Sequence, residues 1–163
     1  MPSSADHGLA QRKQRWVDLM DPTKPPSLVY LIDYNPDPAP LPQWCPDRTQ
    51  ERIDWAMREY ERQVEQMTWL RDDTIPCLDP RTGTEIIAAA FGCPVSRPDD
   101  NMPFARPLIS QPSEVGQVPE PTLDAPSLAQ LFEIGDALRR RAGPDAVMKL
   151  VDVQTPMDNA ALI

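Results

Sequence analysis

Apolar residues recur every three or four positions in three long segments of the chain. This spacing places them on one face of a helix and predicts helices over 9–20, 47–70 and 127–142. The first helix is expected to end before Pro22 and the third at Gly143. The three apolar faces consist of Leu9, Trp16, Val17 and Met20; of Ile53, Met57, Tyr60, Val64, Met67 and Leu70; and of Leu128, Leu131, Phe132 and Leu138.

Polar residues at the starts of two of these segments have the spacing of helix caps. Asp47 is followed three residues later by Gln50, and Ser127 is followed in the same way by Gln130. A side chain at the first position can accept from the free amides of the first turn, and the Gln can reach back. Both pairs therefore predict an N-terminal cap.

Short runs of apolar residues, rich in branched and aromatic side chains, occupy 28–32, 74–78 and 147–153. Such runs are typical of strands that are buried on both faces. The segment 84–91 predicts a short helix that Gly92 closes. Strands that alternate with helices in this way indicate a parallel α/β structure.

The last residues predict the start of one more helix. Thr155 is a good N-cap, Pro156 suits the first helical position, and Asp158 favours the positive end of the helix. The apolar residues up to Ile163 have no C-cap after them. Two interpretations remain open: the chain is cut inside a βα unit, or it ends in a short natural helix that docks on the body.

Prolines, 21 in all, are concentrated in connections between the predicted elements. The segment 35–44 is either a stiff crossover from a strand to a helix or a polyproline ligand for an SH3 or WW module. The segment 93–109 has no helical period, and we expect an irregular insertion with a β-hairpin near Val95 and Leu108. Long insertions of this kind usually cover a functional region.

The net charge of −9 disfavours nucleic acid as a partner. The densest basic run, 139–141, falls in the last turn of a predicted helix, where it favours the helix dipole. No apolar stretch approaches the ~20 residues of a membrane span, so we expect no membrane partner and a cytoplasmic location. Cys45, Cys77, Cys93 and His7 are too dispersed to predict a metal site, and the thiols fit a reducing compartment.

No glycine-rich phosphate loop follows any predicted strand, which disfavours a dinucleotide-binding fold. The pattern instead favours a partial (β/α)8 TIM barrel with a leading helix, about three βα units and the irregular insertion. A complete barrel needs about 250 residues. We therefore expect residues 1–163 to form a single incomplete domain, with residues 1–8 disordered.

Four segments in series, 28–33, 78–92, 97–109 and 151–158, resemble the N-terminal part of the uroporphyrinogen decarboxylase family. That family also includes corrinoid-dependent methyltransferases. The similarity covers nearly all of the chain, although each motif is only moderately specific. It implies a barrel whose strands and loops line a deep cleft, sized for a tetrapyrrole or facing a corrinoid.

The resemblance implies a catalytic aspartate after the second strand, and Asp79 is the nearest candidate. Its alternative role is to cap the turn before Pro80. The arginine-bearing segment that grips substrate carboxylates in the decarboxylases is missing, because Asp33 and Asp37 lie in the corresponding stretch. In the methyltransferase branch a zinc ion activates a thiol, and its ligands belong to the C-terminal half of the barrel. No cofactor is expected on this chain alone, whereas zinc and a corrinoid partner are possible for the complete protein.

Asp33 and Asp37 would repel a polyanionic porphyrinogen, whereas an acidic first loop is compatible with methyl transfer. The favoured hypothesis is thus an N-terminal fragment from the methyltransferase or an uncharacterised branch, inactive alone. Porphyrinogen decarboxylation in tetrapyrrole biosynthesis is the first alternative, and a non-catalytic binding module is the second. The expected partners are the remainder of the barrel and either a small-molecule substrate or a corrinoid protein.

Polar residues just after the predicted strands are further site candidates, because barrel enzymes place their chemistry there. They are Asn35, Arg81 and Gln154, with substrate binding as their expected role, and Asp99, Asp100 and Asn101 in the covering insertion. Loops are also polar simply because water surrounds them.

Overall fold

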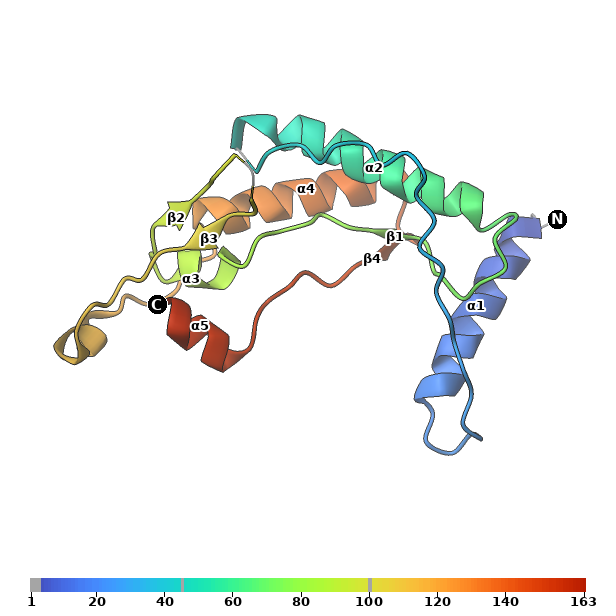
Figure 1. Ribbon diagram of the computed structural model, residues 1–163, viewed down its shortest axis with the longest axis horizontal. Coiled ribbons are helices and arrows are strands. Elements are labelled where there is room, and N and C mark those ends of the chain that lie inside the picture. The colour runs from blue at the N-terminus through green and yellow to red at the C-terminus, as the bar shows by residue number, and fades with distance from the viewer. Residues whose placement is uncertain (1–3, 45, 100) are drawn as a thin grey trace.

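The computed structural model describes residues 4–44, 46–99 and 101–163, and they form an arch (Figure 1). Two long helices, α2 (Thr49–Gln66) and α4 (Pro126–Ala142), lie along its top. Helix α1 (Ser4–Met20) descends at one end. At the other end lie α3 (Ile86–Ala90) and α5 (Pro156–Leu162), near a short 3-10 segment, η2 (Pro112–Gln117).

Two small sheets complete the fold within the described residues. Strand β1 (Cys77–Leu78) pairs in parallel with β4 (Val147–Met148), so two segments about 70 positions apart lie side by side. Strand β2 (Val95–Ser96) pairs antiparallel with β3 (Phe104–Ala105). The segments 74–78 and 147–153, where the sequence predicted strands, thus contain a short parallel pair.

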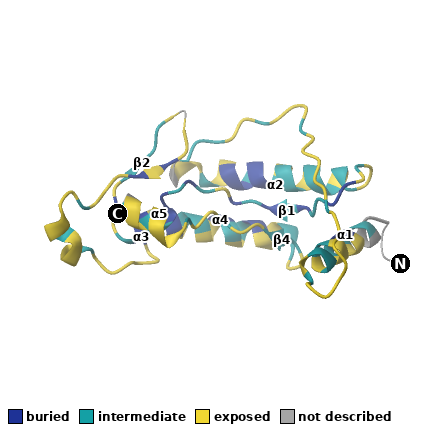
Figure 2. Cartoon of the chain, turned by 60° about the horizontal axis from the view of Figure 1, so that its bottom comes forward, coloured by how far each residue is buried: buried dark blue, intermediate teal, exposed yellow. Residues whose placement is uncertain are grey.

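The main core lies between α2, α4 and the parallel pair. Leu78 and Leu138 are completely buried there, and Ile134 is 1% exposed. Ile53, Trp55 and Ala56 of α2 close the same cluster, which Figure 2 shows as the dark side of α2. Each fully buried leucine contributes about 1.5–3 kcal/mol of transfer free energy. This packing holds β1 at a fixed place beneath the two helices.

The parallel ladder is much shorter than the predicted strands because its neighbours end it. Pro76 and Pro80 flank β1, and proline has no amide hydrogen for a ladder. On the side of β1 away from β4, Gln63 replaces a neighbouring strand. Its Oε1 accepts from the Cys77 amide at 3.1 Å, and its Nε2 donates to the Cys77 carbonyl at 3.5 Å. The sheet is thereby closed on the β1 side.

The predicted buried strand at 28–32 is wrong. The segment is extended but belongs to neither sheet, and Leu28 and Leu31 are 83% and 60% exposed. Its amides bond to carboxylates instead of a strand: Tyr30 N donates to Asp73 Oδ2 and Ile32 N donates to Asp72 Oδ2. No layer of the described chain covers its apolar side chains, so the burial that the pattern predicted is absent.

Several predicted caps are also corrected. Asp47 lies in a 3-10 turn (Pro46–Arg48), and α2 has no side-chain cap. Helix α4 starts at Pro126, so Ser127 lies inside it and the predicted Ser127–Gln130 capping box does not form. Proline at the first position removes one of the free amides that the cap would have satisfied.

Other local predictions are confirmed. Thr155 and Asp158 form a reciprocal capping box on α5, and α4 ends before Gly143, whose φ is +92°. The expected hairpin is present, with its second strand at Phe104–Ala105 and not at Leu108. The disorder expected for 1–8 does not extend to 4–8, which are helical in α1, and 1–3 lie outside the described residues.

Helix α1 is attached to the body by a buried ion pair. Arg12 is 6% exposed and donates to Asp72 at 2.5 Å, to the Thr74 carbonyl at 2.8 Å and to the Leu70 carbonyl at 2.6 Å. Burial alone would raise the pKa of Asp72, but hydrogen bonds from the Thr74 side chain, the Ile32 amide and Arg12 together lower it. One arginine thus satisfies three oxygens at the point where α1 joins the arch.

We expect Arg12→Met to destabilise the chain by about 3–5 kcal/mol, because it leaves the Asp72 carboxylate buried without its cation. Urea unfolding followed by circular dichroism measures this loss. Arg58→Met is the matched control, since Arg58 is exposed on α2 and should change stability by less than about 0.5 kcal/mol. Equal effects of the two substitutions would contradict the anchoring role of Arg12.

The lowered pKa of Asp72 also gives a pH dependence. Its ionised form stabilises the fold above the pKa of the unfolded chain, near 3.8, and this contribution is lost as the pH falls through the lower folded-state value. Asp72→Asn should therefore remove part of the acid sensitivity of unfolding between about pH 5 and pH 2. If Asp72→Asn left the pH dependence of the unfolding free energy unchanged in this range, the contribution of Asp72 would be contradicted.

Candidate functional site

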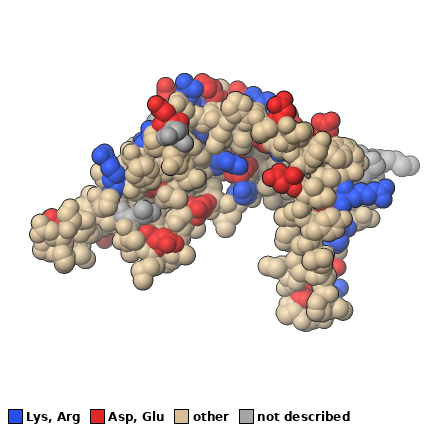
Figure 3. Space-filling model, viewed as in Figure 1, with Lys and Arg blue, Asp and Glu red and all other residues tan. Residues whose placement is uncertain are grey.

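The carboxyl ends of β1 and β4 bring two charged side chains together inside the arch. Asp79 follows β1 and Lys149 follows β4, and the Lys149 amide continues the ladder by donating to the Leu78 carbonyl at 2.8 Å. Lys149 Nζ lies 2.8 Å from Asp79 Oδ2. Figure 3 shows basic and acidic side chains next to each other in the hollow of the arch. Residues that follow two adjacent parallel strands lie at the same end of the sheet.

Arg81 is the second cation beside Asp79. Its amide donates to Asp79 Oδ1 at 2.9 Å, and its Nε lies 3.8 Å from Oδ2. The backbone of Arg81 is left-handed, with φ of +41°, and its guanidinium lies 5.4 Å from the Trp55 ring. The turn-capping interaction predicted for Asp79 is therefore present. The same carboxylate also faces two cations, so one anion is shared between Lys149 and Arg81.

Two cavities meet at this loop. One, of about 290 Å³, is lined by Asp79, Arg81, Thr82 and the chain from Lys149 to Asp152. The other, of about 350 Å³, shares Arg81 and Thr82 with the first, and we call it the loop cavity. It is lined by Leu41, Pro42, Gln43 and Trp44 of the proline-rich loop and by Pro98, Asp99, Asn101 and Met102 of the β2–β3 loop. Both are of the size that small ligands occupy.

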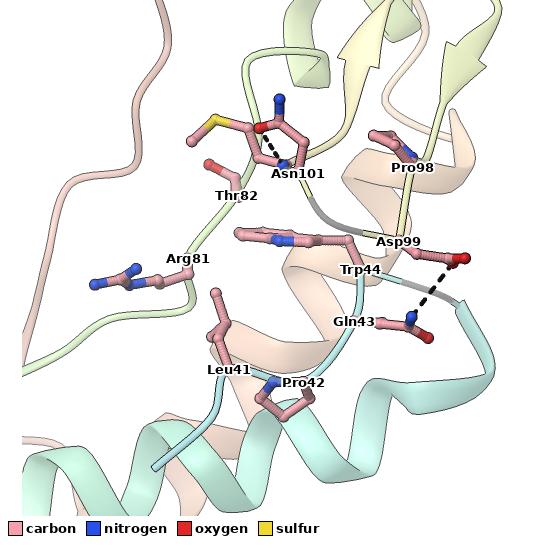
Figure 4. A pocket seen from close by; sticks show the side chains of 10 residues that line it. Leu41, Pro42, Gln43, Trp44, Arg81, Thr82, Pro98, Asp99 and Asn101 are labelled. Carbon is pink, nitrogen blue, oxygen red and sulfur yellow. Dashed lines mark hydrogen bonds between the residues drawn. The ribbon is translucent and has the colours of Figure 1, made fainter. Parts of the chain in front are cut away.

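Trp44 forms the centre of the loop cavity, as Figure 4 shows. The guanidinium of Arg52, on α2, lies 4.3 Å from the Trp44 ring centroid. Gln43 donates to Asp99 at 3.3 Å, which links the proline-rich loop to the β2–β3 loop. An aromatic face with polar groups around it is an arrangement that can hold a planar ligand.

Arg52, on α2, holds the loop after β1. It is 6% exposed, donates to the Pro80 carbonyl at 3.0 Å and also donates to the Arg81 carbonyl. Burial lowers the pKa of Arg52 to about 10, and Glu85 acts in the opposite direction. The guanidinium fork thus bonds two successive carbonyls of the turn that presents Arg81.

Glu85 is the other buried ionisable side chain of the site. It is 5% exposed at the start of α3, and burial raises its pKa against the effects of its own amide, Arg97, Arg52 and Ser127. Arg97 donates to Ser127 Oγ at 3.2 Å. A narrow space lined by these residues adjoins Trp44 and Thr82, and its volume of about 10 Å³ is near the minimum for one water molecule.

Of the remaining predicted site residues, Asn35 and Gln154 lie apart from Asp79 and Arg81. Asn35 lies half-buried in the extended segment and lines neither cavity. Gln154 has a φ of +58° and donates to Asp152 Oδ2 at 2.7 Å, but it does not line the cavities either. Asp99 and Asn101 line the loop cavity, whereas Asp100 lies outside the described residues.

Sequence reasoning missed Lys149, Trp44, Arg52 and Glu85. A usable signal existed for Lys149, because a lone cation interrupts the apolar run 147–153 where a buried strand was expected. No periodicity marks Arg52 or Glu85, since each is a charged residue next to apolar ones. Their burial follows from how α2, α3 and α4 pack, which is a tertiary property.

The described residues do not supply a zinc site on their own. No three His, Cys, Asp or Glu side chains among them come together as metal ligands. Cys93 is buried and Cys77 is half-buried, and burial raises the pKa of both thiols. A thiol with a raised pKa is a poor metal ligand and nucleophile. The described residues therefore do not fit a zinc ion on their own.

Comparisons with known proteins found no matching family model, no matching curated protein and no matching solved structure. Within the described part of the chain, no helix has the length and apolar character needed to cross a bilayer.

We expect Arg52→Met to lower the free energy of unfolding by about 2 kcal/mol or more, because two carbonyls of the loop lose their donor. Arg52→Lys should recover only part of this loss, since an ammonium cannot bond both carbonyls as a planar fork does. Arg58→Lys on the exposed side of α2 is the control. Urea unfolding provides the measurement, and full stability in Arg52→Lys would contradict the need for the fork.

Proposed function

We propose that this chain supplies the N-terminal part of a (β/α)8 barrel of the uroporphyrinogen decarboxylase family, and that the edge bearing Asp79 lines its cleft. The observation that supports this most directly is the parallel pairing of β1 with β4, which brings Asp79 and Lys149 within 2.8 Å at the carboxyl ends of the strands. Barrel enzymes carry their active sites at that end. The family itself rests on the resemblance of the four sequence segments.

Asp79 is the residue to which we assign the central role. It is 24% exposed on its side chain and adjoins the cavity that Arg81 and Lys149 border. A carboxylate held between two cations is fixed in position and remains open to a ligand on one side. In this proposal Asp79 holds Lys149 and Arg81 in place so that they orient anionic groups of the substrate, and in the decarboxylation alternative it also stabilises the positive charge that develops on the pyrrole.

Within the family, the methyltransferase or an uncharacterised branch remains the favoured assignment. Asp33 and Asp37 are exposed acidic residues on the segment that in the decarboxylases carries a carboxylate-binding arginine. Because the described residues do not fit a zinc ion on their own, zinc does not enter the role assigned to this chain. Any zinc or corrinoid contact would belong to the remainder of the barrel.

Porphyrinogen decarboxylation is kept as a second candidate because of one structural observation. Lys149 and Arg81 lie beside Asp79, so cations are present at the strand ends even though the predicted arginine segment is missing. Carboxylate groups of a substrate are held best by such cations. A non-catalytic binding module is the third candidate, and the loop cavity would then hold its ligand.

The first test is the reading frame downstream of the Ile163 codon. We expect it to continue for roughly 90 residues or more, since a complete barrel needs about 250. An immediate stop would contradict an enzymatic barrel made by this chain alone and would favour the binding module.

The second test assays the product of the full reading frame in two reactions. One is methyl transfer from methylcobalamin to 2-mercaptoethanesulfonate, followed by the loss of methylcobalamin absorbance. The other is carboxyl loss from uroporphyrinogen III, followed by chromatography. We expect the first to proceed and Asp79→Asn to lower its kcat by about 10²-fold. Activity only in the second reaction would move the assignment to the decarboxylases.

The controls for this assay separate function from folding. Asp124→Asn removes an exposed carboxylate far from the site in sequence, and Lys24→Met removes a cation about as exposed as Lys149. We expect both to keep wild-type activity, whereas Lys149→Met should raise KM for an anionic substrate. Wild-type kinetics in Asp79→Asn would contradict the role of Asp79 in either reaction.

A further inference from the structure

A buried carboxyl oxygen lies without a partner at the point where two loops meet. Glu85 is 5% exposed, yet its Oε2 has no hydrogen-bond partner among the described residues. Leaving a buried carboxylate oxygen unsatisfied is costly, because the oxygen loses its hydrogen bonds to water. Such an atom needs a physical explanation.

The atoms around Gly83 supply a physical explanation for the unpartnered oxygen of Glu85. A Cβ added to Gly83 would collide with Glu85 Oε2 and with the carbonyl oxygen of Pro103. Both oxygens therefore border the same small space. Pro103 is less than 2% exposed and directly precedes β3, so this contact joins the loop after β1 to the β2–β3 hairpin. Because both oxygens lie beside the same position, a proton on Oε2 would give the pair a donor and an acceptor.

We propose that the protonated carboxyl of Glu85 donates a hydrogen bond from Oε2 to the Pro103 carbonyl, and that this bond latches the β2–β3 hairpin over the loop cavity. The hydrogen is the carboxyl's own proton, so the bond forms only in the neutral state of Glu85. When that proton is lost, the carboxylate has no donor and repels the carbonyl oxygen.

The charged and polar groups around Glu85 come from three elements. Arg52 approaches from α2, Arg97 from the segment after β2, and Ser127 from α4. Arg52 donates its hydrogens to Pro80 and Arg81, and Arg97 donates to Ser127, so neither guanidinium bonds Oε2. Burial nevertheless raises the pKa of Glu85 above its ordinary value of 4.5. The surroundings therefore favour the proton that the latch requires.

The latch controls access to the loop cavity, because the hairpin carries one wall of that cavity. Pro98, Asp99, Asn101 and Met102 belong to the loop between β2 and β3 and form one wall of the loop cavity. Pro103 is the next residue, so a bond at its carbonyl fixes that wall. The hairpin ladder has two residues per strand, Val95–Ser96 and Phe104–Ala105. The Arg106 amide extends it by donating to the Pro94 carbonyl, and Ala105 packs in a buried cluster, so a bond at Pro103 adds to these contacts. This device concerns entry to the cavity and does not depend on the proposed reaction.

Amide hydrogen exchange of the whole chain tests the latch. We expect protection of the Phe104 and Arg106 amides, corrected for intrinsic exchange, to fall about tenfold as the pH rises through the titration of Glu85. Glu85→Gln keeps a donor at every pH and should show high protection that is independent of pH. Glu85→Met keeps the length without a donor and should show low protection throughout. Glu133→Gln, on the exposed side of α4, should behave as wild type.

A second measurement needs no variant to fold. The carboxyl ¹³C shift of Glu85 and the amide ¹⁵N shift of Phe104, which follows the Pro103 carbonyl, should titrate with one common midpoint above 4.5. If a bound water bridges the two oxygens instead, Phe104 will not follow Glu85 and wild-type protection will be independent of pH. Either of those results would overturn the latch.

Discussion

The arrangement of the candidate site depends on the buried guanidinium of Arg52. Its fork bonds the carbonyls of Pro80 and Arg81, and its flat face lies against Trp44. One side chain on α2 therefore fixes the loop after β1 and the proline-rich loop at the same time. Because α2 is itself held by the core around Leu78 and Leu138, the positions of Arg81 and Trp44 follow from helix packing and not from the loops alone.

The ionisable residues of the site differ in burial, and therefore in what they contribute. Arg52 and Glu85 are buried, and burial moves the pKa of each toward its neutral form. Asp79, Lys149 and Arg81 are partly exposed, where ion pairs contribute about 0–1 kcal/mol. The buried pair thus serves the shape of the loops, while the exposed cluster remains free to meet a ligand at little cost to stability.

The sequence predicted the helices well because their apolar faces meet each other. Helices α2 and α4 pack through the stripe residues Ile53 and Leu138, and Leu128 of α4 packs against α3, so a local period carried the tertiary information. The parallel pair followed from the alternation of strands and helices. Of the site, Asp79 and Arg81 could be predicted because they follow a strand, whereas Arg52 and Glu85 could not, since only tertiary burial gives them a role.

The failed prediction at 28–32 has a physical cause that also bears on the proposed barrel. An apolar run predicts burial on the assumption that a second layer covers it, and here carboxylates of Asp72 and Asp73 satisfy its amides while Leu28 and Leu31 remain exposed.

Leu150, just after β4, is likewise 83% exposed, and a cavity of about 450 Å³ lies between β4 and α4. Gln63 blocks the free side of β1 with its amide, so a further strand could join this sheet only beside β4. That is the side on which the proposed barrel would add its next strand. The open edge beside β4 and the exposed Leu150 therefore fit a further strand on that side, whereas a closed barrel, which pairs every strand on both sides, would also need the Gln63 amide to leave β1.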